Sequence, residues 1–200
     1  MTRYIVTGAP GCGKTSVLRE LQALGYDVVD EAATDLITAA QAQGDTETVM
    51  RPEFLDTILR EQISRQKRAD TTSRGVLLHD RSPLCTLALA IYCGHTPSTA
   101  ITNEVNRIVH EGTFEQEVFF VRPIGFVERT AVRRISYDDS LAFERIHEAV
   151  YRDHGYKLVD IEPADIADRA ASIDAFIKAE HQPRGDATQR QRGGPASGSR

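Results

Sequence analysis

The sequence predicts an α/β fold in which a five-stranded parallel sheet is covered by helices on both faces, giving three layers. Short apolar runs alternate with stretches of helical periodicity along most of the 200 residues, a pattern typical of parallel strands joined by crossover helices. A glycine-rich loop separates the first apolar run from the first helix. The length suits one domain, which we expect over residues 1–181, with residues 182–200 as a tail.

The first half of the chain is predicted to hold three strands and three helices. The strands cover residues 4–6, 27–29 and 76–79, and the helices cover residues 13–24, 35–43 and 52–72. Gly8 ends the first strand and Gly25 ends the first helix, on which Val17 and Leu21 share an apolar face. Pro52 suits the first turn of the third helix, where the missing N–H of proline costs no hydrogen bond.

The second half continues the alternation with two more strands. The strands cover residues 117–121 and 156–161, and the helices cover residues 84–93, 98–111, 141–154 and 164–179. Gly94 and Pro97 separate the first two of these helices, and Gly155 ends the third. Ile173 and Ile177 lie on the apolar side of the last helix.

Charge is unevenly distributed along the chain. The tail 182–200 carries four arginines and one aspartate, so the net charge of −5 divides into +3 for the tail and −8 for the body. The tail has no aliphatic side chain larger than alanine, and we expect it to be disordered because it has too little to bury. An acidic body argues against general nucleic-acid binding.

The composition also bears on location. No apolar run approaches the roughly 18 residues of a membrane span, and the first residues do not form a signal peptide. Three cysteines, an odd number without paired zinc-type spacing, fit a reducing compartment and no structural metal. We therefore expect a cytoplasmic protein that is a monomer or a homodimer.

The segment after the first predicted strand matches the phosphate-binding pattern G-x-x-x-x-G-K-[ST] in full. Glycines let the backbone curl into an anion nest, and the following helix adds its positive end. Lys14 would reach the β- and γ-phosphates, and the Thr15 hydroxyl would bind Mg²⁺. The motif predicts a P-loop NTPase fold that takes ATP and Mg²⁺, with these nucleotide-binding residues: Gly8, Ala9, Pro10, Gly11, Cys12, Gly13, Lys14, Thr15 and Ser16.

Acidic residues follow two other predicted strands, and the carboxyl ends of parallel strands meet at one edge of a sheet. Asp80 is expected to hold Mg²⁺ as a Walker-B acid would, the alternative being a helix N-cap. Asp30 or Glu31 would activate an acceptor hydroxyl or else cap the following turn, and we favour Glu31 for the catalytic role. His79 is expected to be a strand residue whose polar atoms are satisfied by a neighbour.

Arginines concentrate in the connection 122–139, at Arg122, Arg129, Arg133 and Arg134. Guanidinium groups match phosphate oxygens, so these residues favour a mobile lid over the transferring phosphoryl group, the alternative being a solvated basic turn. Arg81 is expected to contact the acceptor or a phosphate, and Arg145 to lie on a solvated helix face. The predicted catalytic set is Lys14, Glu31, Asp80, Arg81, Arg129, Arg133 and Arg134.

Beyond the P-loop, several strings in a fixed order resemble the small AAA-labelled, NadR-like P-loop ATPases and kinases. The matching strings are residues 3–15, 26–33, 80–83, 133–136 and 145–156, within a resemblance that covers about residues 2–178. The resemblance implies ATP binding and a nucleoside- or nucleotide-kinase-like core. It maps the acid after the second strand to Glu31, the Asp-Arg pair to Asp80 and Arg81, and the lid arginine to Arg134, but implies no particular acceptor.

Two functions follow from these features. The first is a Mg-ATP-dependent kinase that acts on a small-molecule hydroxyl or phosphate, such as a nucleoside or nucleotide. The second is an ATPase or nucleotide-dependent switch that acts on a protein partner. The guanine-reading string Asn-Lys-x-Asp does not occur, which argues against a GTPase.

Overall fold

The computed structural model describes residues 1–45, 48, 51–124 and 137–182. Within these residues, five strands form one sheet in the order β2-β3-β1-β4-β5, and every neighbouring pair is parallel. The strands are β1 (Thr2–Thr7), β2 (Asp27–Val29), β3 (Val76–Asp80), β4 (Glu117–Val121) and β5 (Lys157–Ile161). The predicted five-stranded parallel sheet is confirmed.

The helices agree with the predicted segments to within a few residues. They are α1 (Lys14–Ala23), α2 (Ala32–Ala42), α3 (Pro52–Thr72), α4 (Pro83–Tyr92), α5 (Thr99–His110), α6 (Tyr137–Asp153) and α7 (Ile166–His181). The helices α2 and α6 begin three and four residues earlier than predicted. In α6 the two acids Asp138 and Asp139 occupy the first turn, where negative charge stabilises the positive end of a helix.

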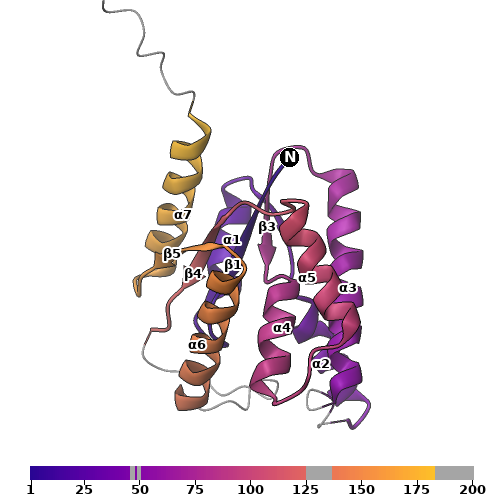
Figure 1. The fold of residues 1–200 in the computed structure, drawn as a ribbon. Helices are drawn as coiled ribbons and strands as arrows, with labels where there is room; N and C mark the ends of the chain where they lie inside the picture. The colour runs from indigo at the N-terminus through magenta and orange to yellow at the C-terminus, as the bar shows by residue number, and fades with distance from the viewer. Residues whose placement is uncertain (46–47, 49–50, 125–136, 183–200) are drawn as a thin grey trace, which may run out of the picture.

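The helices cover both faces of the sheet, as Figure 1 shows. On one face, α1 and α7 pack against each other and against Tyr4 and Val6 of β1. On the other, α3, α4, α5 and α6 enclose a second apolar cluster that contains Ile5. The alternation of β1 residues between the two clusters follows from the two-residue period of a strand.

The strand order decides which loops meet. The central strand β1 lies between β3 and β4, and Val6 pairs with Asp80 near the carboxyl ends of their strands. Since β2 pairs with β3 on the other side, the segments that follow β1, β2 and β3 converge at one edge of the sheet. The candidate site is built there.

Among the residues that the structure describes, no helix has the length and apolar character needed to cross a membrane. Residues 183–200 of the predicted tail and residues 125–136, the central part of the arginine-rich connection, lie outside the described residues.

Candidate functional site

The loop from Gly8 to Gly13 joins β1 to α1 through backbone conformations that favour glycine. Gly8, Gly11 and Gly13 have φ values of 135°, 85° and 89°, in a region that other residues rarely adopt. A Cβ atom on Gly8 would lie only 2.3 Å from the carbonyl oxygen of Val121 at the end of β4. Glycine at position 8 is therefore required both by its φ and by the close approach of two backbones.

Lys14, the first residue of α1, extends its side chain back into this loop. Its side chain is buried, and Nζ donates to the carbonyl oxygens of Gly8 at 3.3 Å and Ala9 at 3.0 Å. The Sγ atom of Cys12 lies 3.7 Å from the same nitrogen. The loop thus surrounds an ammonium group with weak, uncharged partners, an arrangement that a phosphate oxygen could replace with a stronger, charge-assisted hydrogen bond.

Thr15 and Asp80 bring the end of β3 to the start of α1. Thr15 Oγ1 donates to Asp80 Oδ2 at 3.4 Å, whereas buried Asp80 Oδ1 has no hydrogen-bond partner among the described residues. Burial raises the pKa of Asp80 to about 6, against the opposing effect of the Lys14 cation. The alternative that Asp80 caps α4 is wrong, because Ser82 occupies the N-cap position.

These oxygens fit a magnesium ion. Mg²⁺ prefers hydroxyl and carboxylate oxygens, usually alongside water and phosphate ligands. A buried carboxylate oxygen without a partner, next to a threonine hydroxyl, supplies both of the donor types that a P-loop site needs.

Glu31 and Arg81 form an ion pair at the ends of β2 and β3. Arg81 Nε donates to Glu31 Oε1, and Thr34 Oγ1 donates to Glu31 Oε2 at 2.7 Å. Burial alone would raise the pKa of Glu31, but the Arg81 and Lys14 cations and these hydrogen bonds lower it to about 2. Burial likewise opposes the charge of Arg81, yet the Glu31 carboxylate raises the pKa of Arg81 above its usual range.

The two residues of the ion pair have unusual backbone positions. Arg81 has a φ of 73°, a strained conformation for a side chain of this size that costs about 1–3 kcal/mol. Glu31 occupies the N-cap position of α2, but its side chain makes no capping hydrogen bond. Asp30 instead points to solvent and pairs with Arg19 at 3.0 Å. Of the two acids after β2, Glu31 is therefore the one that faces Arg81.

His147 on α6 completes this cluster and was not predicted from the sequence. The residue is fully buried, with Nδ1 3.1 Å from the carbonyl oxygen of Phe143 and Nε2 3.5 Å from Arg81 Nη1. Burial, followed by the Arg81 cation, lowers the pKa of His147 to about 3. A neutral ring that donates from Nδ1 leaves Nε2 as an acceptor facing Arg81. His147 lies in the string 145–156 that carries the family resemblance, but the resemblance assigned it no role.

The arginines of the 122–139 connection separate into two groups. Arg122 is held by the carboxylates of Glu144, Glu148 and Asp160 and stacks over the Phe120 ring. Because it is engaged by three acids, Arg122 does not belong to a phosphate-binding lid, and that part of the prediction is wrong. Arg129, Arg133 and Arg134 lie outside the described residues.

Two further expectations concern single residues. Arg145 is exposed on α6, as predicted. His79 differs from the prediction, because its buried Nε2 has no hydrogen-bond partner among the described residues. The ring packs edge-on against Phe114 instead, and burial lowers the pKa of His79 to about 3.

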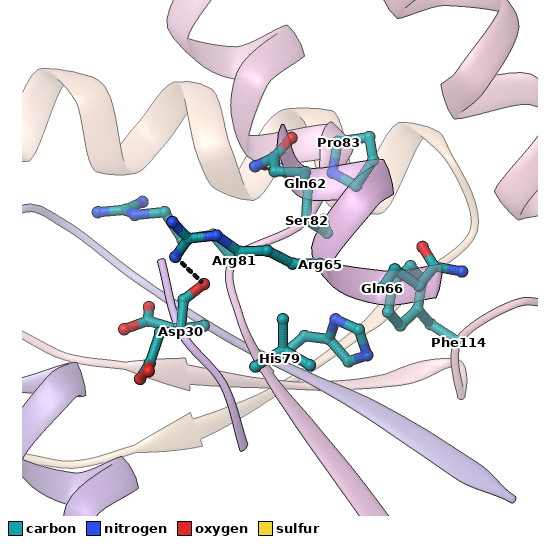
Figure 2. A pocket seen from close by; sticks show the side chains of 11 residues that line it. Asp30, Gln62, Arg65, Gln66, His79, Arg81, Ser82, Pro83 and Phe114 are labelled. Atoms are coloured by element: carbon teal, nitrogen blue, oxygen red, sulfur yellow. Dashed lines mark hydrogen bonds between the residues drawn. The ribbon is translucent and has the colours of Figure 1, made fainter. Parts of the chain in front are cut away.

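A pocket lies between α3 and the carboxyl ends of β2 and β3, next to the ion pair. Asp30 and Arg81 line one end, Gln66 and Phe114 line the other, and the His79 ring lies between them (Figure 2). The remaining lining residues are Val29, Gln62, Arg65, Asp80, Ser82 and Pro83. Polar groups therefore surround an opening that adjoins both Asp80 and Arg81.

The fold and the loop geometry place this chain among P-loop proteins with an adjacent acid–arginine pair. Residues 3–169 match a family model described as an AAA domain. The chain therefore belongs to this AAA domain family, and the resemblance indicated by its motifs is confirmed. A comparison with curated proteins finds no match.

Solved structures with the same fold include nucleoside kinases. NadR protein in complex with NR is 16% identical with a TM-score of 0.64, and the match covers 88% of this chain and 51% of that chain. Deoxyadenosine kinase from M. mycoides with bound dATP is 15% identical with a TM-score of 0.59, covering 89% of this chain and 100% of the kinase. These likenesses show a shared fold, that of the P-loop nucleoside kinases.

Proposed function

We propose that the protein is a Mg-ATP-dependent phosphotransferase that acts on a small-molecule hydroxyl or phosphate, with a nucleoside or nucleotide as the expected acceptor. The observation that carries this proposal is the position of the Glu31–Arg81 ion pair beside the Lys14 loop and Asp80. A loop that only hydrolyses ATP needs no largely buried acid–arginine pair at the neighbouring strand ends.

The nucleotide side of the proposed site consists of residues 8–16. The loop N–H groups and the start of α1 would bind the phosphates, and Lys14 would neutralise charge on the β- and γ-phosphates. Thr15 and Asp80 would hold Mg²⁺, which supplies charge neutralisation between the phosphate oxygens when bound. Catalysis in such a site consists mainly of positioning and electrostatic stabilisation.

The acceptor side consists of Glu31 and Arg81. A carboxylate whose pKa is about 2 is a weak base, so we propose that Glu31 accepts a hydrogen bond from the acceptor hydroxyl and orients it. This suits phosphoryl transfer, whose loose transition state requires little proton abstraction early in the reaction. Arg81 would fix the carboxylate and contact the acceptor or the transferring phosphoryl group.

Further support comes from the arginine-rich segment and from proteins of the same fold. Arg129, Arg133 and Arg134 are proposed to supply positive charge to the transferring phosphoryl group from a lid. The printed descriptions of the similar structures include NR bound to NadR and dATP bound to deoxyadenosine kinase. Both descriptions agree with a nucleoside or nucleotide ligand.

The test is an acceptor screen. The purified chain would be given ATP and Mg²⁺ with a panel of nucleosides, nucleotides and other small alcohols while ADP release is measured. We expect ADP release to rise at least about tenfold with one acceptor class and a phosphorylated product to form in equal amount. An exposed-site variant, Arg145→Ala, serves as the control that keeps wild-type turnover.

Turnover that ignores every small acceptor but increases with a protein partner would refute the kinase proposal and support the ATPase or switch alternative. Inactivity with all acceptors, combined with no ATP binding, would refute nucleotide chemistry at this site altogether.

A further inference from the structure

Arg169, in the first turn of α7, contacts the phosphate loop at the carbonyl of Cys12. Its guanidinium is buried, and Nη1 donates to the carbonyl oxygen of Cys12 at 2.8 Å. Nη2 donates to the carbonyl oxygen of Arg122 at 2.7 Å. The same Nη1 atom would lie 3.2 Å from a Cβ atom on Gly13, so the guanidinium packs directly against the N-cap glycine of α1.

The charge of Arg169 is not neutralised within the described part of the chain. No carboxylate there forms an ion pair with it, and its buried Nε has no hydrogen-bond partner. Burial lowers the pKa of Arg169. A buried charge without a counter-ion is costly, and a neutral side chain could fill this space at lower cost. An anion bound at the loop would offset this cost.

Peptide geometry connects Arg169 to the phosphate site. The Cys12–Gly13 peptide is trans, as are all peptides of the described residues, so its carbonyl and its N–H point in opposite directions. Because Arg169 holds the Cys12 carbonyl on the α7 side, the Gly13 N–H is directed away from α7. The first N–H groups of a helix also lack intrahelical partners, which leaves them free for an anion.

The second hydrogen bond anchors the loop to β4. The Arg122 carbonyl belongs to the residue just after that strand, and Gly8 already packs against Val121 at the same strand end. Both ends of the loop, Gly8 and the Cys12–Gly13 peptide, are thus fixed to one place on the sheet. A loop held at both ends needs little reordering when a phosphate binds.

We infer that Arg169 is a positioning residue of the phosphate site, which holds the Cys12–Gly13 peptide with its N–H toward a bound polyphosphate and adds positive charge on the α7 side of the loop. This inference deepens the proposed function and rests on its nucleotide-binding half alone, not on the identity of any acceptor.

The experiment compares ADP binding by wild type, Arg169→Met and Arg169→Lys, with Arg19→Met as an exposed arginine control on the neighbouring helix. Calorimetry gives the affinities, and thermal unfolding without nucleotide checks the fold. We expect Arg169→Met to weaken ADP binding at least about tenfold, because it removes a charge and two charge-assisted hydrogen bonds. Arg169→Lys keeps the charge but not the paired donors, and should bind ADP with intermediate affinity.

A spectroscopic readout separates positioning from mere stability. In ¹H–¹⁵N spectra, the Gly13 amide of wild type should shift downfield when ADP is added, as expected for an N–H that donates to a phosphate. The shift should be smaller in Arg169→Lys and smallest in Arg169→Met. If Arg169→Met fails to fold, the test rests on Arg169→Lys alone. The inference is overturned if Arg169→Lys shows the same Gly13 shift and the same ADP affinity as wild type.

The outcomes also distinguish this inference from the proposed function. Loss of ADP binding in Lys14→Met, with both Arg169 variants binding like wild type, would overturn the role of Arg169 and leave nucleotide binding intact. A wild-type protein that binds no ADP would overturn the proposed function, and this inference with it.

Discussion

The phosphate loop and the Glu31–Arg81–His147 cluster are two neighbouring parts of one site that are built in different ways. The loop is a continuous segment whose shape is set by its backbone. Three of its glycines have positive φ values, and Gly8 lies close to the backbone of Val121. The cluster gathers side chains from the end of β2, the end of β3 and the middle of α6. The first depends on local geometry, whereas the second depends on how distant elements pack.

The two parts also differ in how their cations are held. Lys14 Nζ donates to uncharged carbonyls of its own loop, whereas the buried Arg81 faces a carboxylate. Removing Lys14 therefore leaves no unpaired charge behind, but removing Glu31 leaves a buried guanidinium without its counter-ion. Removing the cation of the loop should therefore affect function, and removing the carboxylate of the cluster should affect stability. The backbone of the loop should also affect stability, because Gly8 lies against Val121. The following experiments test these contrasts.

The largest effect is expected from Gly8→Ala. The new Cβ would lie 2.3 Å from the Val121 carbonyl oxygen, and Gly8 has a φ of 135°. Overpacking and backbone strain together should lower the free energy of unfolding by about 4 kcal/mol. Chemical denaturation measures this loss. Gly25→Ala is the matched control, because Gly25 also has a positive φ but has no atom within 4 Å of its Cβ position, and should cost about 1 kcal/mol. Equal losses in the two variants would contradict the backbone contact.

Glu31→Gln is expected to destabilise the fold by about 3 kcal/mol, because it leaves Arg81 buried and unpaired. The double variant Glu31→Gln/Arg81→Met should recover part of that stability, since it removes the stranded charge. Urea denaturation of the two single variants and the double variant gives the coupling energy. A double variant whose loss equals the sum of the single losses would show that the ion pair is not coupled.

Lys14→Met should separate function from stability. We expect ATP binding or turnover to fall about 100-fold or more, since the main positive charge on the phosphates is lost. Stability without nucleotide should stay the same or rise, because a buried ammonium group is removed. Calorimetry and thermal unfolding measure the two quantities. Unchanged nucleotide binding would contradict the assignment of the loop.

The last prediction concerns the dependence of stability on pH. The folded-state pKa of His147 is about 3 against an ordinary value of 6.5, so its contribution to stability is present above pH 6.5 and is lost as the pH falls toward 3. His147→Leu should make the dependence of unfolding free energy on pH shallower by about 1 kcal/mol per pH unit in this range. The raised pKa of Asp80 makes stability fall as the pH rises between about pH 4 and 6. Asp80 is present in both wild type and His147→Leu, so its effect cancels when the two curves are compared. Parallel pH curves for wild type and variant would contradict the buried neutral histidine.

Much of the fold was predictable because its signals are local. Apolar runs, helical periodicity and glycine stops placed five strands and seven helices close to where the structure has them. The phosphate loop was predictable for the same reason, since glycines and Lys14 stand in one contiguous motif. Glu31 was favoured over Asp30 for a catalytic role, and that role stays a prediction; the structure shows that Glu31 pairs with Arg81 and Asp30 with Arg19.

The strands, the phosphate loop and the acids that follow the strands could all be read from the sequence, because hydrophobic period and motif spacing act over a few residues. The packing of distant elements places three carboxylates around Arg122 and His147 next to Arg81. It also places Arg169 against the Cys12 carbonyl, 157 residues away in the chain. The physical reason is that a charged side chain is defined by its partners, and packing brings those partners from distant parts of the chain.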